Sequence, residues 1–363
     1  MSTLGDMVTL TIAGESHGPA VAAILSGLPA GIPVDCGFIK AQLEKRRGIP
    51  EAATERREPD DFEILSGVFG GFTDGAPITV VIRNKSADSA AYERDKIRPG
   101  HADYTAFCKY HGYQDYRGGG HFSGRISAAV VAAGAIAEYA LHLLGISVGT
   151  HILRLGEVFD RPFSESEGLN DLMLLDKAEF AVLDEEAGER MKAAVSAAKA
   201  EGESLGGILE TKIIGLPEGL GEPWFGGIEG EISRGIFGIP AIKGIEFGAG
   251  FGLAAMKGSE ANDEFCLDAF NHIVTETNNC GGVLGGISDG MPVIFRCAVK
   301  PTPSVAKEQK TVDMSTMEET KIKITGRHDP AIAARAAVIV DSVTAICLCD
   351  LYTKRFGSDW SVG

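Results

Sequence analysis

Two segments near the start of the chain alternate apolar and polar residues in the way that half-buried strands do. Val8, Leu10 and Ile12 alternate with threonines, and residues 20–28 form a second, mostly apolar run. Successive side chains of a strand point to opposite faces, so this pattern predicts strands with one face buried. Further strands are expected at 62–69, 78–82, 208–214 and 292–299.

Longer segments repeat apolar residues every three or four positions, which predicts helices. Residues 126–144 have a continuous apolar face rich in alanine, so we expect this helix to pack tightly in the interior. Segments 38–47, 185–200 and 331–352 are also expected to be helices, the second with charges on its outer side and the third a long closing helix. The first of these ends in Lys45-Arg46-Arg47-Gly48, and helix C-termini favour both cations and glycine.

The order of the predicted elements favours one large domain. Strands and helices are interleaved without regular alternation, and no repeat of fixed period is visible. The weakest pattern lies in 158–182, and residues 307–317 are expected to form a polar loop. No Pro- or Ser-rich linker divides the chain. We therefore predict a single α+β domain over residues 1–363 rather than two domains.

Composition narrows the class of protein. The 363 residues are 44% hydrophobic, which excludes a disordered chain, and 34 basic against 50 acidic residues give a net charge of −16. A general nucleic-acid binder needs a basic surface, so no nucleic-acid partner is expected. The apolar run at 126–137 is too short to span a bilayer, and residues 1–30 show no signal peptide. We expect a soluble, cytoplasmic protein without a membrane partner.

The common signatures of nucleotide and metal sites are missing. Seven cysteines include no C-x-x-C pair, so we expect neither a disulfide framework nor a zinc site, and no metal. The sequence also lacks a P-loop, a dinucleotide-binding G-x-G-x-x-G and the H-E-x-x-H motif.

What remains is a set of polar islands in glycine-rich loops. They are Ser16-His17, 98–104 with His101, 117–125, 300–304, and 326–330 with Asp329. Taken alone, four of them are more often structural, as a buried histidine, a turn or a helix cap, and only 117–125 is equally consistent with a cap and a site. The start of the 126–144 helix, beside Ser123 and Arg125, suits an anion. Five cations between Lys45 and Arg57 also suit an anionic ligand, although such a run is usually a solvated face.

Taken together and in order, these islands resemble the chorismate synthase family over nearly the whole chain. The motifs are residues 14–18, 98–105, 115–120, 278–282, 300–304 and 326–330. The resemblance implies a β-α-β sandwich fold and a homotetramer. It implies a carbon-oxygen lyase of the shikimate pathway of aromatic amino acid biosynthesis, which removes phosphate from 5-enolpyruvylshikimate 3-phosphate by 1,4-anti elimination to give chorismate. The reaction requires reduced FMN but has no net redox change.

The resemblance also implies residue roles, carried over position by position. The catalytic residues would be His17, His101, Asp329 and Ser16. Substrate contacts would be Arg46, Arg47, Arg125 and Arg335. The flavoprotein's FMN contacts would be His121, Phe122, Ser123, Pro240, Ala241, Gly285, Lys300, Pro301, Thr302, Pro303, Ser304 and Arg327.

Two departures from the family's pattern are visible. His121 stands where many members have arginine, and Ile126 stands where they have glutamate. We expect the neighbouring Phe122 to stack on or border the flavin. The loop after Arg47 is short and lacks an arginine that many members have. Some fungal members reduce their flavin with NADPH; without a dinucleotide fingerprint, this chain is expected to use an external flavin reductant rather than bind NADP itself.

Two functions from other classes compete with this interpretation. A flavin-free binding module for phosphorylated sugars or acids would keep the cations but would not need His17, His101 and Asp329 together. An FMN oxidoreductase with net hydride transfer would consume reductant in step with product. A purely structural oligomer fits least, because it has no use for polar glycine loops.

Overall fold

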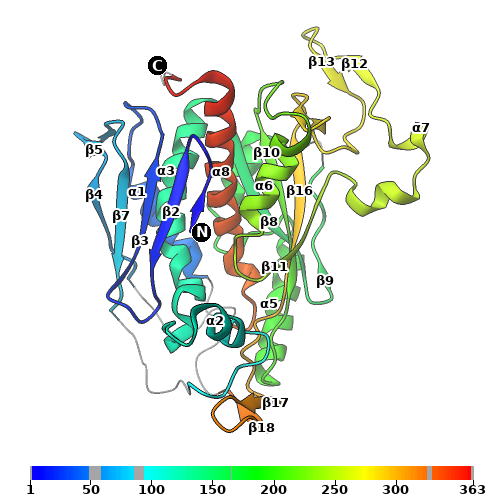
Figure 1. Ribbon diagram of the computed structural model, residues 1–363. Helices are drawn as coiled ribbons and strands as arrows, with labels where there is room; N and C mark the ends of the chain where they lie inside the picture. Colours follow the sequence, from blue (N-terminus) through cyan, green and yellow to red (C-terminus); the bar gives the residue numbers. More distant parts are fainter. Residues whose placement is uncertain (1, 49–58, 86–93, 165, 325–328, 361–363) are drawn as a thin grey trace.

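The computed structural model describes residues 2–48, 59–85, 94–164, 166–324 and 329–360. In these residues, two antiparallel five-stranded sheets enclose a layer of helices (Figure 1). The first sheet has the order β1 (Thr3–Leu4), β2 (Thr9–Gly14), β3 (Ala20–Ser26), β7 (Ile78–Arg83) and β4 (Phe62–Ser66). The second has the order β11 (Ile242–Phe247), β16 (Val293–Val299), β10 (Gly207–Ile214), β8 (Ser147–Leu155) and β9 (Val158–Phe159).

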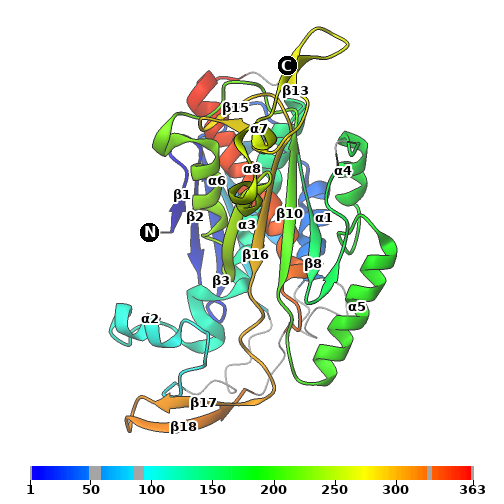
Figure 2. The same ribbon diagram turned by 90° about the vertical axis from the view of Figure 1, so that its right-hand side faces the viewer.

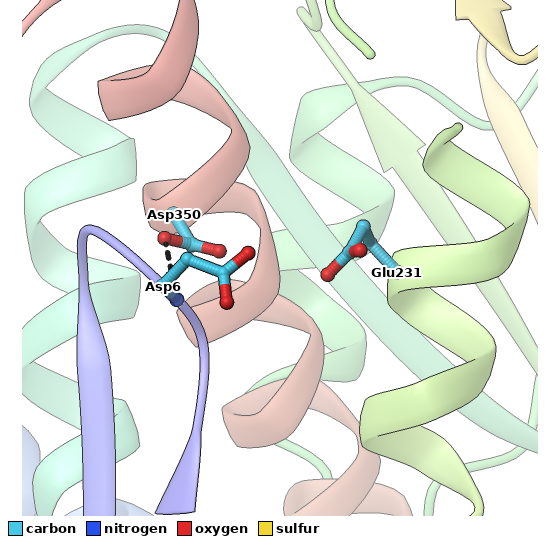
Figure 3. A group of neighbouring side chains, drawn as sticks. All are labelled: Asp6, Glu231 and Asp350. Atoms are coloured by element: carbon cyan, nitrogen blue, oxygen red, sulfur yellow. Dashed lines mark hydrogen bonds between the residues drawn. The ribbon is translucent and has the colours of Figure 1, made fainter. Parts of the chain in front are cut away.

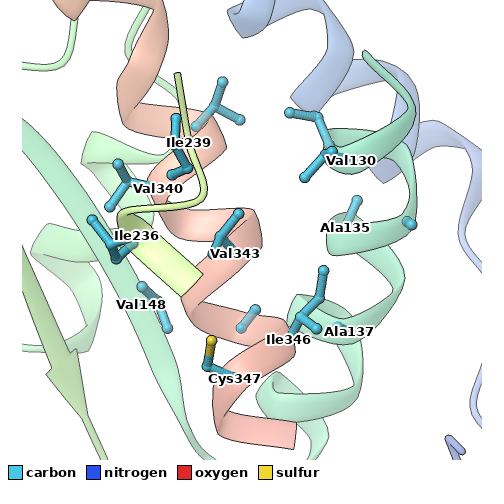
Figure 4. Close-up of a cluster of buried hydrophobic side chains, with 14 of the residues drawn as sticks. Val130, Ala135, Ala137, Val148, Ile236, Ile239, Val340, Val343, Ile346 and Cys347 are labelled. Atoms are coloured by element: carbon cyan, nitrogen blue, oxygen red, sulfur yellow. The ribbon is translucent and has the colours of Figure 1, made fainter. Parts of the chain in front are cut away.

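Two apolar helices form the middle of the sandwich. Helix α3 (Ser127–Leu143) packs on β3 and β7, and α8 (Ala333–Phe356) packs on β8 and β10. The two helices pack against each other, closely enough that a Cβ at Gly134 would lie 2.3 Å from the Cβ of Ser342. Helices α1 (Cys36–Arg47) and α6 (Ile228–Ile236) flank them. Figure 4 shows apolar side chains of α3, α6 and α8 that meet beside Val148 of β8.

Helices α3 and α8 are also long and apolar enough, by length and composition, to cross a membrane. In the fold, however, 78% of the residues in the window over 124–143 and 89% of those over 333–356 are buried. Because the sheets and neighbouring helices already cover their apolar surface, both are core helices of the sandwich.

Smaller elements complete the described chain. Helix α4 (Leu169–Leu175) contacts β8, and α5 (Glu185–Ala200) contacts β9. Four short hairpins lie outside the two five-stranded sheets, and Figure 2 shows one of them, β17–β18, projecting from one end of the sandwich. They are β5–β6 (Val68–Phe69, Phe72–Thr73), β12–β13 (Phe265–Leu267, Ile273–Thr275), β14–β15 (Val283–Leu284, Ile287–Ser288) and β17–β18 (Glu308–Asp313, Glu318–Lys323), with α7 (Gly258–Ala261) before β12.

Most expected elements are present, and the α+β, β-α-β sandwich class is confirmed. The polar loop expected at 307–317 is wrong, because β17 and β18 form a hairpin there. Its residues pair with each other and leave no apolar stripe to recognise. The pattern also missed β8, β11, α6 and the short helix α2 (Asp103–Tyr110).

Candidate active site

The loop after β2 carries Ser16 and His17 and is fixed by the glycine segment 118–120. The Ser16 N–H donates to the Gly120 carbonyl over 3.0 Å, and the Ser16 side chain is buried. Gly118 has a φ of +60°, and a Cβ at this position would lie 2.4 Å from two ring atoms of His17. Glycine alone combines that conformation with so close an approach. The triple glycine therefore lies directly against His17.

An ionised carboxylate lies near the same loop. Asp115 accepts two hydrogen bonds from the Arg117 guanidinium, each 2.8 Å long. These bonds lower the pKa of Asp115, and the nearby charge of His17 adds to the effect.

Two of the polar islands, residues 98–104 and 300–304, are in contact through His101. Its Nε2 lies 2.6 Å from the Ser304 hydroxyl oxygen, and Ser304 is buried. Lys300 donates from Nζ to the Gly100 carbonyl over 2.7 Å. A bidentate ion pair between Arg98 and Asp103 closes the turn that presents His101. Segments about 200 positions apart thus form one surface.

Asp329 joins the same group of loops. The Thr302 hydroxyl donates to the Asp329 carbonyl over 2.7 Å, and the Asp329 carboxylate is paired with the Arg335 guanidinium. Arg327, a predicted FMN contact, lies outside the described residues.

Two of the predicted substrate arginines converge on a single carboxylate. Arg46 donates to Asp60 over 2.7 Å, and Arg125 donates to the other oxygen of Asp60. Arg335 donates from Nε to the Arg46 carbonyl over 2.7 Å. Burial lowers the pKa of Arg46 to about 10, because the attraction of Asp60 only partly offsets desolvation and the neighbouring guanidinium groups. Arg47, by contrast, hydrogen-bonds the Pro59 carbonyl.

The variant loop lies beside the first strand. His121 must donate from Nδ1 to the Gly14 carbonyl, 2.9 Å away, since a carbonyl oxygen can only accept. Phe122 is 42% exposed, and its ring centroid lies 6.3 Å from that of Tyr110. The Ser123 hydroxyl accepts the Arg125 N–H over 3.3 Å. Phe122 is thus an accessible aromatic surface within the loop cluster, by which we mean the loops at 14–18, 98–104, 117–125, 300–304 and 329–330 with the arginines they contact.

The remaining predicted FMN contacts divide into two places. The turn at Pro240-Ala241 adjoins the 300–304 segment, where the Lys300 N–H donates to the Ala241 carbonyl over 2.9 Å. Gly285 is elsewhere: it turns the β14–β15 hairpin, which precedes β16, whereas Lys300 follows β16. It lines a groove of about 650 Å³ with Trp224, Phe247 and other residues. The structure does not bring Gly285 to the other predicted contacts of this chain.

A separate group of carboxylates lies between the β1–β2 turn, α6 and the C-terminal part of α8. Asp6, Glu231 and Asp350 offer oxygen atoms within 4.8 Å of one another (Figure 3). The Lys354 ammonium lies 2.7 Å from Asp6 and 2.9 Å from Asp350, and it already supplies a cation to the group. One oxygen of Asp350 also accepts the backbone N–H groups of residues 6–8. The group is thus an ion-pair cluster that attaches the β1–β2 turn to α8.

Sequence reasoning missed two residues of the loop cluster, Asp60 and Asn84. Asp60 is 3% exposed and has a φ of +53°. Asn84 accepts from the Nε of Arg125 over 2.9 Å and donates to the Glu15 and Gly18 carbonyls over 3.0 and 2.8 Å. No motif announces either residue, since each acts through partners that only folding brings near.

Hydrogen bonds thus connect the loops of two histidines, an aspartate and several arginines in an α+β sandwich. Guanidinium groups bind oxyanions well, so such a basic, polar cluster is suited to an acidic small molecule.

Comparison with known proteins identifies the family. The chorismate synthase family model matches residues 8–353. The chain is 46% identical over 353 residues to chorismate synthase of Dehalococcoides mccartyi, covering 96% of each sequence. It is 46% identical over 348 residues to that of Pyrococcus abyssi, covering 95% of this chain and 96% of the relative. A chorismate synthase crystal structure superposes with a TM-score of 0.76 at 29% identity, covering 97% of this chain and 94% of the other.

This chain belongs to the chorismate synthase family, which is a family of lyases. The resemblance noted in the sequence islands is therefore confirmed.

Proposed function

We propose that this protein converts 5-enolpyruvylshikimate 3-phosphate into chorismate and phosphate by 1,4-anti elimination, with reduced FMN, in the shikimate pathway. Family membership over residues 8–353 supports the reaction. The observation that carries the assignment of the site is the convergence of the islands. The loops of His17, His101 and Asp329 lie together with Arg46, Arg125 and Arg335 through the contacts described above.

The substrate of this reaction carries two carboxylates and a phosphate, so its site needs several cations. Arg46, Arg125 and Arg335 supply guanidinium groups that can bind oxyanions in bidentate fashion. Among the described residues, the buried Nε–H of Arg46 has no hydrogen-bond acceptor. A donor left without an acceptor in the interior is costly, and an anionic ligand would satisfy it.

The proposed catalytic roles follow from charge and position. Protonated His17 would stabilise the negative charge that develops on the departing phosphate. His101 would hold or donate a proton at Nε2, with Ser304 fixing the ring. Asp329, aided by Ser16, would accept the proton that leaves the substrate ring, so that its carboxylate acts as the final base. Arg335 holds that carboxylate in place.

The residues present fit FMN. The exposed ring of Phe122, the hydroxyls of Ser123 and Thr302, and the ammonium of Lys300 offer a stacking surface, hydrogen bonds and a cation for a phosphate. Reduced FMN, when bound, supplies electron density to the substrate and takes it back. The 300–304 segment and Pro240-Ala241 would orient it, and His121 would border it through its exposed loop.

An anaerobic assay tests this function. Protein, FMN, dithionite and 5-enolpyruvylshikimate 3-phosphate are mixed, and chorismate and phosphate are followed together. Equal release of both, absent when FMN stays oxidised and without net consumption of reductant, is the expected result. Consumption of reductant in step with product would instead establish an oxidoreductase, and binding without turnover a module that has lost catalysis.

A His101→Ala variant tests the proposed acid. Turnover should fall by roughly two orders of magnitude, as expected on loss of a general acid–base group, while FMN binding and the unfolding midpoint stay close to those of the original protein. Unchanged turnover would remove His101 from the mechanism.

We further propose a cytoplasmic homotetramer supplied by an external flavin reductant. Self-association is supported by large aromatic side chains that this chain leaves almost fully exposed: Trp224, Phe225, Phe251 and Phe270 are 80–92% accessible. Aromatic side chains are enriched at interfaces between protein subunits. Light scattering on the protein and on a Trp224→Ser/Phe225→Ser variant tests the tetramer. A monomeric original protein would contradict it.

A further inference from the structure

Asp60 is placed between two guanidinium groups in the interior of the loop cluster. One carboxylate oxygen accepts from Arg46 over 2.7 Å, and the other accepts from Arg125. Its side chain is fully buried, and those of Arg46 and Arg125 are 6% and 5% exposed. Each oxygen serves a different arginine, so this one carboxylate fixes the distance between the two guanidinium groups.

The Asp60 backbone adopts an unfavourable conformation in this position. Its φ of +53° lies in the left-handed region, which a residue with a Cβ seldom adopts. Such a conformation persists only where surrounding contacts hold it, and it is common at functional sites. Among the described residues, both guanidinium groups hold the Asp60 side chain in this position.

The bridge that Asp60 forms between Arg46 and Arg125 is connected to the His17 loop by Asn84. Its amide oxygen accepts from Arg125, and its amide nitrogen donates to the carbonyls of Glu15 and Gly18, which flank Ser16 and His17. In the other direction, Arg335 donates to the Arg46 carbonyl and pairs with Asp329. Contacts thus run without a break from the His17 loop to Asp329.

The balance of charge at the bridge leaves room for an anion. Asp60 offers one negative charge to Arg46 and Arg125 together, and both attraction and hydrogen bonding from these groups hold its pKa low against the effect of burial. Arg46 keeps a buried Nε–H with no acceptor among the described residues. If Asp60 served only to neutralise a buried cation, one arginine would be enough for it. The second arginine and the unsatisfied Nε–H of Arg46 therefore point to a further anion.

We propose that Asp60 is a positioning residue that presets Arg46 and Arg125 for the anionic groups of the substrate. Asn84 extends this setting to the loop of His17. The proposal rests on the proposed function, because it assigns Asp60 to that same substrate site. Preset donors bind more tightly because less ordering is required when the ligand arrives.

The principal test is Asp60→Asn, with Asp61→Asn as the matched control. Asparagine keeps the shape of the side chain, but its NH₂ group cannot accept from a guanidinium. Asp61 is the adjacent carboxylate, 71% exposed and paired with Lys85, so it offers the same substitution outside the cluster. Titration calorimetry with 5-enolpyruvylshikimate 3-phosphate and the oxidised FMN enzyme measures binding without turnover.

We expect the Kd and KM for the substrate to rise about tenfold or more in Asp60→Asn, with kcat and the Kd for FMN changed much less. Asp61→Asn should behave as the original protein. A lowered unfolding midpoint with unchanged Kd and KM in Asp60→Asn would overturn the proposal and leave a structural ion bridge.

If Asp60→Asn does not fold, Asn84→Ala provides a second test of the proposal. It leaves both arginines on Asp60 but cuts the link to residues 15–18, so kcat should fall by about tenfold while the substrate Kd changes less. Unchanged kcat and KM in this variant would contradict the proposed extension to His17. Failure of the unaltered protein to form chorismate or to bind the substrate would instead refute the proposed function itself.

Discussion

The imidazole of His101 and the hydroxyl of Ser304 lie 2.6 Å apart although 203 positions separate them in the chain. The contact joins the turn before α2 to the segment that follows β16. Since Ser304 is buried and His101 is only partly so, the hydroxyl determines how the ring is presented.

Removal of this hydroxyl should impair turnover without impairing the fold. In Ser304→Ala the ring of His101 loses its partner, and we expect kcat to fall by about tenfold, the equivalent of one hydrogen bond. Steady-state kinetics and FMN titration measure the effect. Ser315→Ala, in the exposed β17–β18 turn, is the control and should be silent. A drop in thermal stability with no change in kcat would show that Ser304 serves packing alone.

The glycine segment offers a steric test of His17. In Gly118→Ala the new Cβ would meet the imidazole at 2.4 Å, so the ring must move. Gly119→Ala is an ideal comparison: its φ of +82° imposes similar backbone strain, but its Cβ meets only the Ser123 side chain, at 3.8 Å. Both variants should lose about 1 kcal/mol of unfolding free energy. Only Gly118→Ala should also reduce kcat by about tenfold or more. Equal kcat values in the two would argue against a role for His17.

Two helical glycines should respond to alanine with opposite signs. At Gly134 in α3 the Cβ would collide with Ser342 of α8, so Gly134→Ala should cost about 1–3 kcal/mol of unfolding free energy. At Gly230 in α6 the nearest atom is 3.8 Å away, and alanine should stabilise by up to about 1 kcal/mol. Urea unfolding followed by circular dichroism distinguishes them. A stabilised Gly134→Ala protein would mean that α3 and α8 are less tightly packed than described.

A buried pair of acids between α3 and α8 should make stability depend on pH. Burial raises the pKa of Asp341 to about 7, despite an opposing hydrogen bond from Thr150, and burial together with Asp341 raises the pKa of Glu138 well above its usual value. The folded protein therefore binds more protons than the unfolded chain between about pH 4 and pH 7, and its stability falls as the pH rises through that window.

Asp341→Asn tests this dependence, because the amide remains neutral. The variant should exceed the original protein by about 1–2 kcal/mol at pH 8, and the difference should shrink towards pH 4. Glu138→Gln should act in the same direction, since either change removes the like charge. Urea unfolding at several pH values gives the comparison. A constant difference at all pH values would show that Asp341 does not titrate in this range.

The sequence predicted regular elements best where one face is apolar. The helix expected at 185–200 has those bounds in the structure, and the alternation in 292–299 matches β16, whose buried residues alternate with half-buried ones. The β17–β18 hairpin could not be anticipated, because most of its residues are polar and its two strands pair mainly with each other. Strand β8 was missed because it is buried on both faces and so shows no alternation.

The candidate site was predictable as islands but not as an assembly. The resemblance supplied His17, His101 and Asp329, yet no pattern could indicate that Thr302 holds the Asp329 backbone. Asp60 and Asn84 were invisible for the same reason. Their importance comes from partners between 14 and 69 positions away, and such contacts exist only once the sheets have formed.

The Asp350 contact with the β1–β2 turn has a consequence for synthesis of the protein. The three backbone N–H groups of residues 6–8 find their acceptor on α8, which is made more than 340 residues later. Helix α3 likewise buries part of its apolar surface against α8, which is made later. During synthesis the side of α3 that faces α8 is therefore exposed, and we expect the growing chain to bind chaperones until α8 leaves the exit tunnel.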